Sequence, residues 1–211
     1  MPELTPASFA FADAVIDRAD ALRNDPDALR RVWPAAQLLL LDADGNAYAD
    51  AQGQPLALTG AALGDVVEQA IFLGLRDGDA WFAVGAGMRD ADIDPPQRMD
   101  LRRAAAEWPA FASGLFAYAR GMLHWQSRTR FCGVCGGAIG FRRGGFLGVC
   151  AQCASEHYPR VDPAVIVAVS DGARLLLGRQ ASWPARRYSV IAGFVEPGES
   201  LEQTVAREVA E

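Results

Sequence analysis

The chain lacks lysine altogether, and its 211 residues contain only two histidines. All 20 basic residues are therefore arginines, whose planar guanidinium groups favour bidentate contacts with phosphate. They are outnumbered by 26 acidic residues, which gives a formal net charge of −6. This acidic balance argues against a protein that coats nucleic acid without selectivity.

Long hydrophobic runs are also missing. The longest apolar stretches, residues 38–41 and 164–169, are much shorter than the roughly 20 residues that a membrane-spanning helix needs. Residues 1–22 have neither the basic start nor the continuous apolar core of a secretory signal. We therefore expect a cytoplasmic protein that does not enter a membrane. With 51% hydrophobic residues and no low-complexity segment, it has material for one large or two small globular domains.

Cysteine is absent outside one short window. Cys132 and Cys135 form one CxxC pair, Cys150 and Cys153 form another, and fourteen residues separate the pairs. Two such pairs can bring four thiolates together around a tetrahedral zinc ion. Because four protein ligands leave no position open for water, we expect this zinc to be structural. Two disulfides, or a redox-active CxxC, are the less favoured alternatives in a cytosolic chain.

The insert between the two cysteine pairs reads as a β-hairpin. Apolar residues 139–141 and 146–149 flank the turn sequence Arg-Arg-Gly-Gly at 142–145. The whole module therefore has the pattern of a zinc ribbon. Its arginines could form a basic patch for nucleic acid, although solvated arginines on a hairpin are the simpler interpretation. The arginines concerned are Arg128, Arg130, Arg142 and Arg143.

Other segments predict ordinary secondary structure. Residues 37–41 and 47–49 should pair as a hairpin around the turn residues 42–46, and residues 81–84 should form another strand. Apolar residues recur every three or four positions over 99–126, which predicts an amphipathic helix that could bend near Pro109. After the cysteine module, residues 165–169 and 175–177 should be two strands of a buried sheet, followed by a strand over 188–192.

The last stretch, residues 193–211, carries the strongest signal for chemistry. Ser200 and Gln203 have the spacing of a capping box, so a helix should begin there. On that helix Glu208 and Glu211 are three residues apart and lie on the same face, where two carboxylates attract a hard divalent cation. A solvated helix with scattered acidic residues is the alternative interpretation.

These residues resemble the signature of the Nudix hydrolases, with matches at five constrained positions: Gly193, Glu199, Arg207, Glu208 and Glu211. The zinc ribbon ends in Tyr158-Pro159, which makes the chain similar to the NADH pyrophosphatase (NudC-type) branch of that family. The resemblance implies an α+β fold. Its expected parts are an N-terminal α/β domain (1–127), the zinc ribbon (128–160) and the first part of a Nudix α/β/α sandwich (161–211).

The resemblance further implies hydrolysis of the pyrophosphate bond of NADH or NAD⁺ to nicotinamide mononucleotide and AMP, assisted by magnesium or manganese. Some members of the branch also remove NAD caps from RNA. Glu208 and Glu211 would hold the metal together with the backbone carbonyl of Ala192. A homodimer is expected from the family.

Two further roles follow from the same resemblance. Arg207 and Glu199 would form an ion pair that steadies the helix. Phe194 and Tyr158 would stack on a ring of the substrate, although both border apolar sequence and could instead be core aromatics.

The match to the signature stops at Glu211. The family pattern continues with another glutamate and a glycine, and then with further strands of the domain. We therefore expect an incomplete copy that is weakly active or inactive. From another functional class, a catalytically silent zinc-ribbon module that binds RNA or protein is the alternative.

Magnesium-dependent cleavage of NADH by the 211-residue chain is accordingly expected to be weak or absent, and to appear in a chain lengthened beyond Glu211. An NADH hydrolysis assay on both proteins tests this. Inactivity of both would contradict the enzymatic interpretation, and full activity of the shorter protein would contradict incompleteness.

Overall fold

The computed structural model describes residues 9–12, 14–85 and 93–211. Its chain divides into two compact units, Met1–Pro159 and Arg160–Glu211. Both contain strands and helices, which agrees with the α+β class expected from the sequence. Within the described residues, no helix combines the length and the apolar character needed to cross a membrane.

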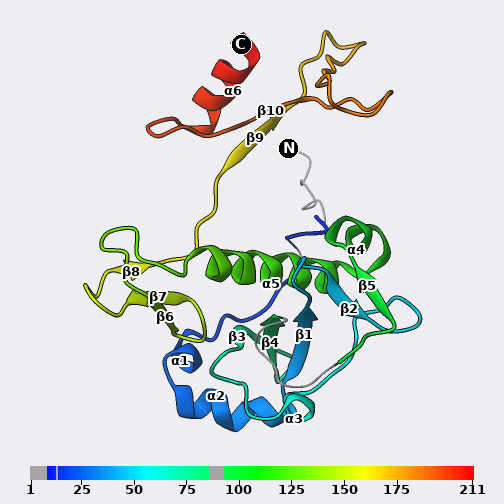
Figure 1. Ribbon diagram of the computed structural model, residues 1–211. Coiled ribbons are helices and arrows are strands. Elements are labelled where there is room, and N and C mark those ends of the chain that lie inside the picture. The colour runs from blue at the N-terminus through cyan, green and yellow to red at the C-terminus, as the bar shows by residue number, and fades with distance from the viewer. Residues whose placement is uncertain (1–8, 13, 86–92) are drawn as a thin grey trace. The chain divides into compact units, whose positions relative to one another are not determined.

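A five-stranded mixed sheet in the order β3-β4-β1-β2-β5 forms the centre of the first unit (Figure 1). The strands are β1 (Gln37–Leu41), β2 (Ala47–Ala49), β3 (Ile71–Arg76), β4 (Asp79–Gly85) and β5 (Gln97–Met99). β1 runs parallel to β4 and antiparallel to β2. The predicted hairpin of β1 and β2 and the predicted strand at 81–84 are thus confirmed.

The turn between β1 and β2 explains why this hairpin is predictable from the sequence. Asp42 accepts hydrogen bonds from the backbone N–H groups of Asp44 (3.0 Å) and Asn46 (2.8 Å). Gly45 has a φ of 77°, a conformation that suits glycine. Side-chain acceptors of this kind compete well for the turn amides, so the residue types themselves define the turn.

Helices cover both faces of this sheet (Figure 1). On one face lie α4 (Leu101–Glu107) and α5 (Ala110–Arg128), and on the other lie α2 (Pro26–Val32), the 3-10 turn η1 (Trp33–Ala35) and α3 (Gly60–Leu63). The short helix α1 (Asp20–Arg23) precedes α2. Because the sheet is buried on both sides, its strands are apolar almost continuously. Leu38 and Leu40 face one helical layer, and Leu39 and Leu41 face the other.

The single helix predicted over 99–126 is wrong in one respect. Met99 belongs to β5, and the helical part is divided at Trp108 and Pro109 into α4 and α5. Proline lacks a backbone N–H and pushes the preceding residue out of the helical region, and Trp108 accordingly has an extended ψ of 154°. The indole Nε1 of Trp108 donates to the carbonyl of Gly53 at 2.7 Å, so the break is anchored.

The ribbon is a three-stranded sheet of β6 (Ile139–Arg142), β7 (Leu147–Cys150) and β8 (Glu156–His157). The predicted hairpin of β6 and β7 is confirmed. Its tip is hydrogen-bonded to the rest of the first unit. The carbonyl of Gly144 accepts from the N–H of Phe72 (2.9 Å), and the carbonyl of Gly145 accepts from the side chain of Gln126 (2.8 Å).

The second unit contains two antiparallel strands and one helix. These are β9 (Ala164–Val167), β10 (Ile191–Phe194) and α6 (Leu201–Ala210), which packs against both strands. Of the two strands predicted in a buried sheet, the first is present as β9 but is not buried, since Ile166 is 74% exposed. Residues 175–177 make only an isolated bridge at Leu175. Within Arg160–Glu211, all of which is described, no second helical layer covers these leucines, and Leu176 is 55% exposed. The strand predicted over 188–192 is present in part, because β10 begins only at Ile191.

The first unit's core offers a direct test of this architecture. Phe82 on β4 is fully buried, with ring centroids 5.1 Å from Trp33 and 5.2 Å from Phe72. Phe82→Ala should lower the free energy of unfolding by about 3–5 kcal/mol, because it removes buried apolar surface and leaves a cavity. Urea denaturation followed by tryptophan fluorescence measures the loss.

Phe131→Ala is the matched control, because this phenylalanine is 68% exposed. Its effect on the free energy of unfolding should stay within about 0.5 kcal/mol. Equal losses in the two variants would contradict the layered core.

Candidate functional site

Helix α6 begins at a reciprocal cap. The N–H of Gln203 donates to Ser200 Oγ at 3.3 Å, and the N–H of Ser200 donates to Gln203 Oε1 at 2.8 Å. The predicted capping box is therefore confirmed. Because the cap determines where the helix starts, it also determines which later residues share a face.

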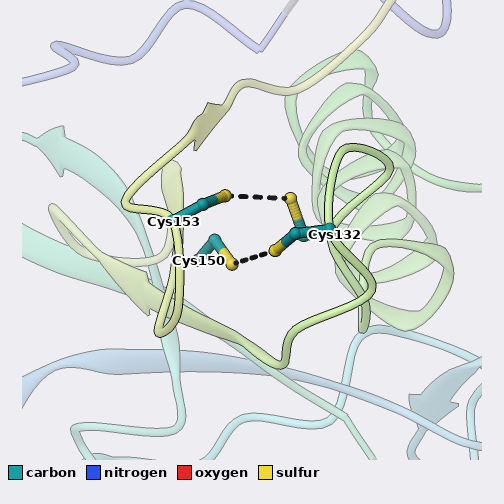
Figure 2. Close-up of side chains that lie close together, drawn as sticks. Cys132, Cys150 and Cys153 are labelled. Carbon is teal, nitrogen blue, oxygen red and sulfur yellow. Dashed lines mark hydrogen bonds between the residues drawn. The ribbon is translucent and has the colours of Figure 1, made fainter.

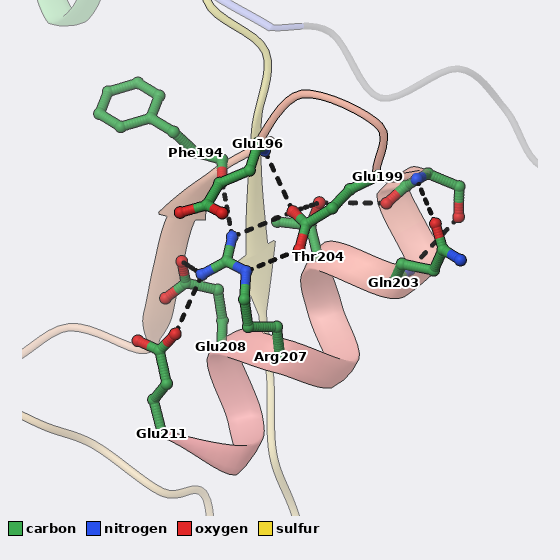
Figure 3. A network of polar contacts seen from close by, with 9 residues as sticks. Phe194, Glu196, Glu199, Gln203, Thr204, Arg207, Glu208 and Glu211 are labelled. Carbon is green, nitrogen blue, oxygen red and sulfur yellow. Dashed lines mark hydrogen bonds and ion pairs between the residues drawn. The ribbon is translucent and has the colours of Figure 1, made fainter.

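That face collects one arginine and several carboxylates (Figure 3). Arg207 donates from Nε to Glu199 Oε1 at 2.7 Å and from Nη2 to Glu199 Oε2 at 3.1 Å. Its Nη1 donates to Glu208 at 2.8 Å and to Glu211 at 3.2 Å. Nη2 also donates to the carbonyl of Phe194 on β10 at 2.9 Å. One guanidinium thus joins the loop before the helix, the helix itself and the strand.

Glu199 accepts more hydrogen bonds than the other carboxylates of this network. Besides Arg207, it accepts from the N–H of Glu196 at 3.0 Å and from the hydroxyl of Thr204 at 2.9 Å. These hydrogen bonds, above all the one from Arg207, lower the pKa of Glu199 to about 2. The pKa of Arg207 is raised in return, chiefly by Glu199 and then by Glu208 and Glu211. The pair therefore stays charged at all ordinary pH values.

Glu208 lies directly over the backbone of β10. A Cβ atom at Gly193 would overlap the Glu208 carboxylate as it lies in this structure, so a larger residue would force that side chain to move. Gly193 is one of the five positions that match the family signature. Ala192, the residue before it, pairs with Ile166 on β9, which makes this part of β10 a regular strand.

The site offers the oxygen donors that a hard divalent cation requires. Glu208 and Glu211 converge on the same Arg207 nitrogen, so a single positive group already contacts both carboxylates. Glu208 also reaches the strand next to Ala192, whose backbone carbonyl is a further oxygen donor. Carboxylate and carbonyl oxygens are the usual ligands of Mg²⁺ and Mn²⁺, so the donor set fits such a cation.

The four cysteines form a second cluster, in the first unit (Figure 2). All are free thiols, and their sulfur atoms lie within 4.8 Å of one another. Cys132 Sγ is 3.7 Å from Cys153 Sγ, and Cys135 Sγ is 3.4 Å from Cys150 Sγ. Four sulfurs bound tetrahedrally to zinc at about 2.3 Å would be separated by about 3.8 Å. The convergence of all four sulfurs therefore fits zinc, and none of the four cysteines forms a disulfide in this structure.

Backbone amides and neighbouring groups prepare these sulfurs for a cation. The N–H groups of Val134 and Gln152 point at the first sulfur of each pair at 3.4 Å. Ser155 and its hydrogen bonds lower the pKa of Cys153 to about 6. The Gly137 amide acts in the same direction on Cys135, but the adjoining thiols outweigh it and raise that pKa to about 12. A cation bound to the four sulfurs removes the repulsion between neighbouring thiolates.

Both predicted stacking aromatics are exposed, so neither is a core residue. Tyr158 follows β8 in the first unit, is 55% exposed, and donates its hydroxyl proton to the carboxylate of Glu156. Phe194 ends β10 in the second unit and is 67% exposed. An exposed ring face is what stacking on a substrate ring requires.

Two members of the helix network were not identified from the sequence. Thr204 is fully buried, and its hydroxyl bridges the helix to Glu199. It shares a helix face with Arg207 and Glu208, and this spacing was a signal that could have been used. The Phe194 carbonyl has no comparable signal, because a backbone acceptor looks alike in every residue.

Comparison with protein families accounts for almost the whole chain. A family model described as "NADH pyrophosphatase-like rudimentary NUDIX domain" matches residues 34–125. The "NADH pyrophosphatase zinc ribbon domain" matches residues 127–158, and the "NUDIX domain" matches residues 160–211. The chain therefore belongs to the Nudix family, in the NADH pyrophosphatase branch, and the resemblance read from its motifs is confirmed.

Individual relatives show which members of this branch the chain resembles. The chain is 40% identical to the NAD-capped RNA hydrolase NudC of Mycobacterium tuberculosis and of Mycobacterium bovis, over 200 residues that make up 92% of this chain and 64% of each relative. It is 39% identical over 153 residues to the NAD-capped RNA hydrolase NUDT12 of Macaca fascicularis, which is 63% of this chain and 32% of that protein. The chain thus spans 64% of the length of the NudC relatives.

The low pKa of Glu199 predicts a pH-dependent stability. Its carboxylate is stabilised in the folded state, so this contribution is fully present above the usual value near 4.5 and disappears as the pH falls through about 2. Glu199→Gln should therefore lower the unfolding temperature of the second unit at pH 7, with the difference from wild type shrinking between about pH 4.5 and 2.

Circular dichroism melts over this pH range test the effect. Glu196→Gln is the control, because its exposed side chain forms no ion pair within Arg160–Glu211. A Glu199→Gln difference that persists unchanged at pH 2 would contradict the assigned ion pair.

Zinc removal tests the cysteine cluster. We expect about one zinc ion per chain, and a chelator should unfold the ribbon and lower the unfolding temperature of the first unit, because a structural zinc site stabilises only the folded state. Cys150→Ser should have the same effect without chelator. Metal analysis combined with thermal unfolding measures both. A zinc-free protein with unchanged stability would contradict the assignment.

Proposed function

We propose that these residues belong to an enzyme that hydrolyses the pyrophosphate bond of NADH or NAD⁺, yielding nicotinamide mononucleotide and AMP. The observation that carries the proposal is the Arg207 network, in which Glu208 and Glu211 are held together beside the strand residues Ala192 and Gly193. In this reaction water forms a new bond to one phosphorus, the bridging P–O bond breaks, and the other phosphate leaves with the bridging oxygen.

Glu208, Glu211 and the carbonyl of Ala192 are the proposed ligands of magnesium or manganese. Such a cation, when bound, neutralises the charge of the diphosphate and of the leaving phosphate. The protein's own task is to hold oxygen donors at fixed positions, since preorganised groups need not rearrange during the reaction.

Arg207 and Glu199 are proposed as positioning residues. Two nitrogens of Arg207, Nε and Nη2, are engaged by Glu199 and by the carbonyl of Phe194. The third, Nη1, is the one that contacts the proposed metal ligands. The arginine therefore stays anchored to the loop and the strand when Glu208 and Glu211 turn to a cation.

Tyr158 and Phe194 are proposed to stack on rings of the dinucleotide. Their exposure supports this role, because a buried ring could not offer its face. Base stacking on aromatic side chains is sequence-tolerant and contributes about 1–3 kcal/mol per base.

Removal of NAD caps from RNA is the second candidate activity. Its chemistry is the same, and it is supported by the relatives in Mycobacterium tuberculosis and Macaca fascicularis, both named as NAD-capped RNA hydrolases. Competition between free NADH and an NAD-capped transcript distinguishes the two substrates.

We also propose that the protein works as a cytoplasmic homodimer. A reducing compartment suits four thiols that hold zinc, since oxidation to disulfides would destroy the site. Sedimentation of the zinc-loaded protein checks the oligomeric state.

The metal ligands can be tested without relying on turnover. Glu208→Gln and Glu211→Gln should each weaken Mn²⁺ binding by about tenfold or more, measured by electron paramagnetic resonance, because each removes a charged oxygen donor. NADH hydrolysis, where the wild type shows it, should fall in parallel.

Glu202→Gln is the control on the same helix. Its carboxylate accepts from the cap hydroxyl of Ser200 and forms no ion pair within residues 160–211, so both Mn²⁺ affinity and hydrolysis should be unchanged. Wild-type Mn²⁺ affinity in Glu208→Gln would refute the proposed ligand set.

A further inference from the structure

A large cleft lies within the first unit. It has a volume of about 1030 Å³ and opens between α5, the turn after β1 and the tip of the ribbon hairpin. Ligand sites in proteins commonly measure about 300–1,000 Å³, so this cleft has room for a sizeable ligand. Among the residues that the structure describes, its charged lining comprises six arginines and three carboxylates, in a chain whose net charge is −6.

Two of the three carboxylates are already neutralised. Glu68 is paired with Arg30, and Asp42 accepts from the amides of its own turn and lies 3.6 Å from Arg98. Asp44 is the remaining acidic group. The positive side of the cleft is therefore opposed by little negative charge.

Four of the six arginines, Arg23 and three others, form no ion pair with a carboxylate in the part of the chain that the structure describes. Arg120 on α5, Arg130 after α5 and Arg142 at the end of β6 all line the cleft, and none of them forms an ion pair with a carboxylate in the part of the chain that the structure describes. Arg143, by contrast, is paired with Asp20. Arg120, Arg130 and Arg142 come from separate segments, which spreads positive charge along the cleft.

Arg23 is a further arginine of the lining. Arg23 lies over the ring of Phe146, with 3.8 Å between the guanidinium carbon and the ring centroid. Burial lowers the pKa of Arg23, and the positive charges of Arg18 and Arg143 act in the same direction, partly offset by Tyr118 and Asp20. An anion in the cleft would relieve this repulsion.

Aromatic surface adjoins the arginines. Phe141 forms part of the lining, and Phe131, next to Arg130 in the chain, is 68% exposed. Basic grooves interleaved with aromatic rings are the arrangement with which proteins hold single-stranded nucleic acid, the cations on the phosphates and the rings against the bases.

We propose that this cleft binds the sugar–phosphate backbone of single-stranded RNA. The inference rests on the RNA-cap alternative of the proposed function, and it assigns the part of the transcript beyond the cap to the first unit. A single dinucleotide carries only one diphosphate, whereas arginines from three segments suit several successive phosphates.

Fluorescence anisotropy with a labelled single-stranded RNA of twelve nucleotides that carries a 5′ monophosphate tests the proposal. This probe has no NAD cap, so its binding does not depend on hydrolysis. Replacing Arg120, Arg130 and Arg142 together by glutamine should weaken binding by about tenfold or more and should reduce the slope of log K against log salt concentration by about 2, as expected for three lost phosphate contacts on a single strand.

Three comparisons make the result specific. The same three arginines changed to lysine should retain most of the affinity, because phosphate attraction needs mainly the charge. A control triple variant at Arg31, Arg102 and Arg103, which lie outside the cleft lining, should bind as the wild type does. Glu208→Gln should also bind normally, which separates RNA binding from the hydrolytic site.

Equal loss in the two glutamine triple variants would mean a general charge effect and would overturn the proposal. Absence of binding by the zinc-loaded wild type would overturn it as well. Complete displacement of the RNA by free NADH would place the RNA at the dinucleotide site and not in the cleft. Loss of NADH hydrolysis with intact RNA binding would instead count against the proposed activity alone.

Discussion

The candidate site depends on one arginine that is shared by three structural elements. Arg207 extends from α6 to Glu199 in the preceding loop and to the Phe194 carbonyl at the end of β10. Because a guanidinium offers five N–H donors in a rigid fork, it can satisfy these partners and still contact Glu208 and Glu211. The position of both acidic side chains therefore follows from the anchoring of a residue that need not touch the substrate.

The close contact between the Glu208 side chain and the backbone of β10 is the second constraint on the same site. The Glu208 carboxylate occupies the space that any side chain at Gly193 would need. A side chain at this position would therefore displace Glu208 from the place where Arg207 holds it. The glycine of the signature thus leaves room for the carboxylate beside β10.

In the first unit, the metal centre and the cleft are physically connected. The β6–β7 hairpin is part of the ribbon that contains the four cysteines. At its tip, Gly144 is hydrogen-bonded to the sheet and Gly145 to α5. Arg142 stands at the base of that tip and lines the cleft. A structural zinc ion can therefore matter for a binding surface that it does not touch, because without the folded ribbon one wall of the cleft would be missing.

The segments that the sequence predicted well are those with local causes. The turn after β1 is made by Asp42 and Gly45, the start of α6 by Ser200 and Gln203, and the ribbon hairpin by its apolar flanks. The sequence predicts a bend near Pro109 but not the complete separation of α4 from α5, since a proline can either bend a helix or end it. The prediction of a buried strand at residues 175–177 is wrong, because three consecutive leucines are buried only if another element covers them.

The sequence by itself determined the family, the four sulfur ligands and the acidic pair of α6, because spacing along the chain converts directly into proximity on a knuckle or a helix face. Only the tertiary structure decided that Arg207 reaches the Phe194 carbonyl, that Thr204 is buried against Glu199, and that Arg120, Arg130 and Arg142 line one cleft. These contacts join residues from separate elements, and their existence depends on how those elements pack.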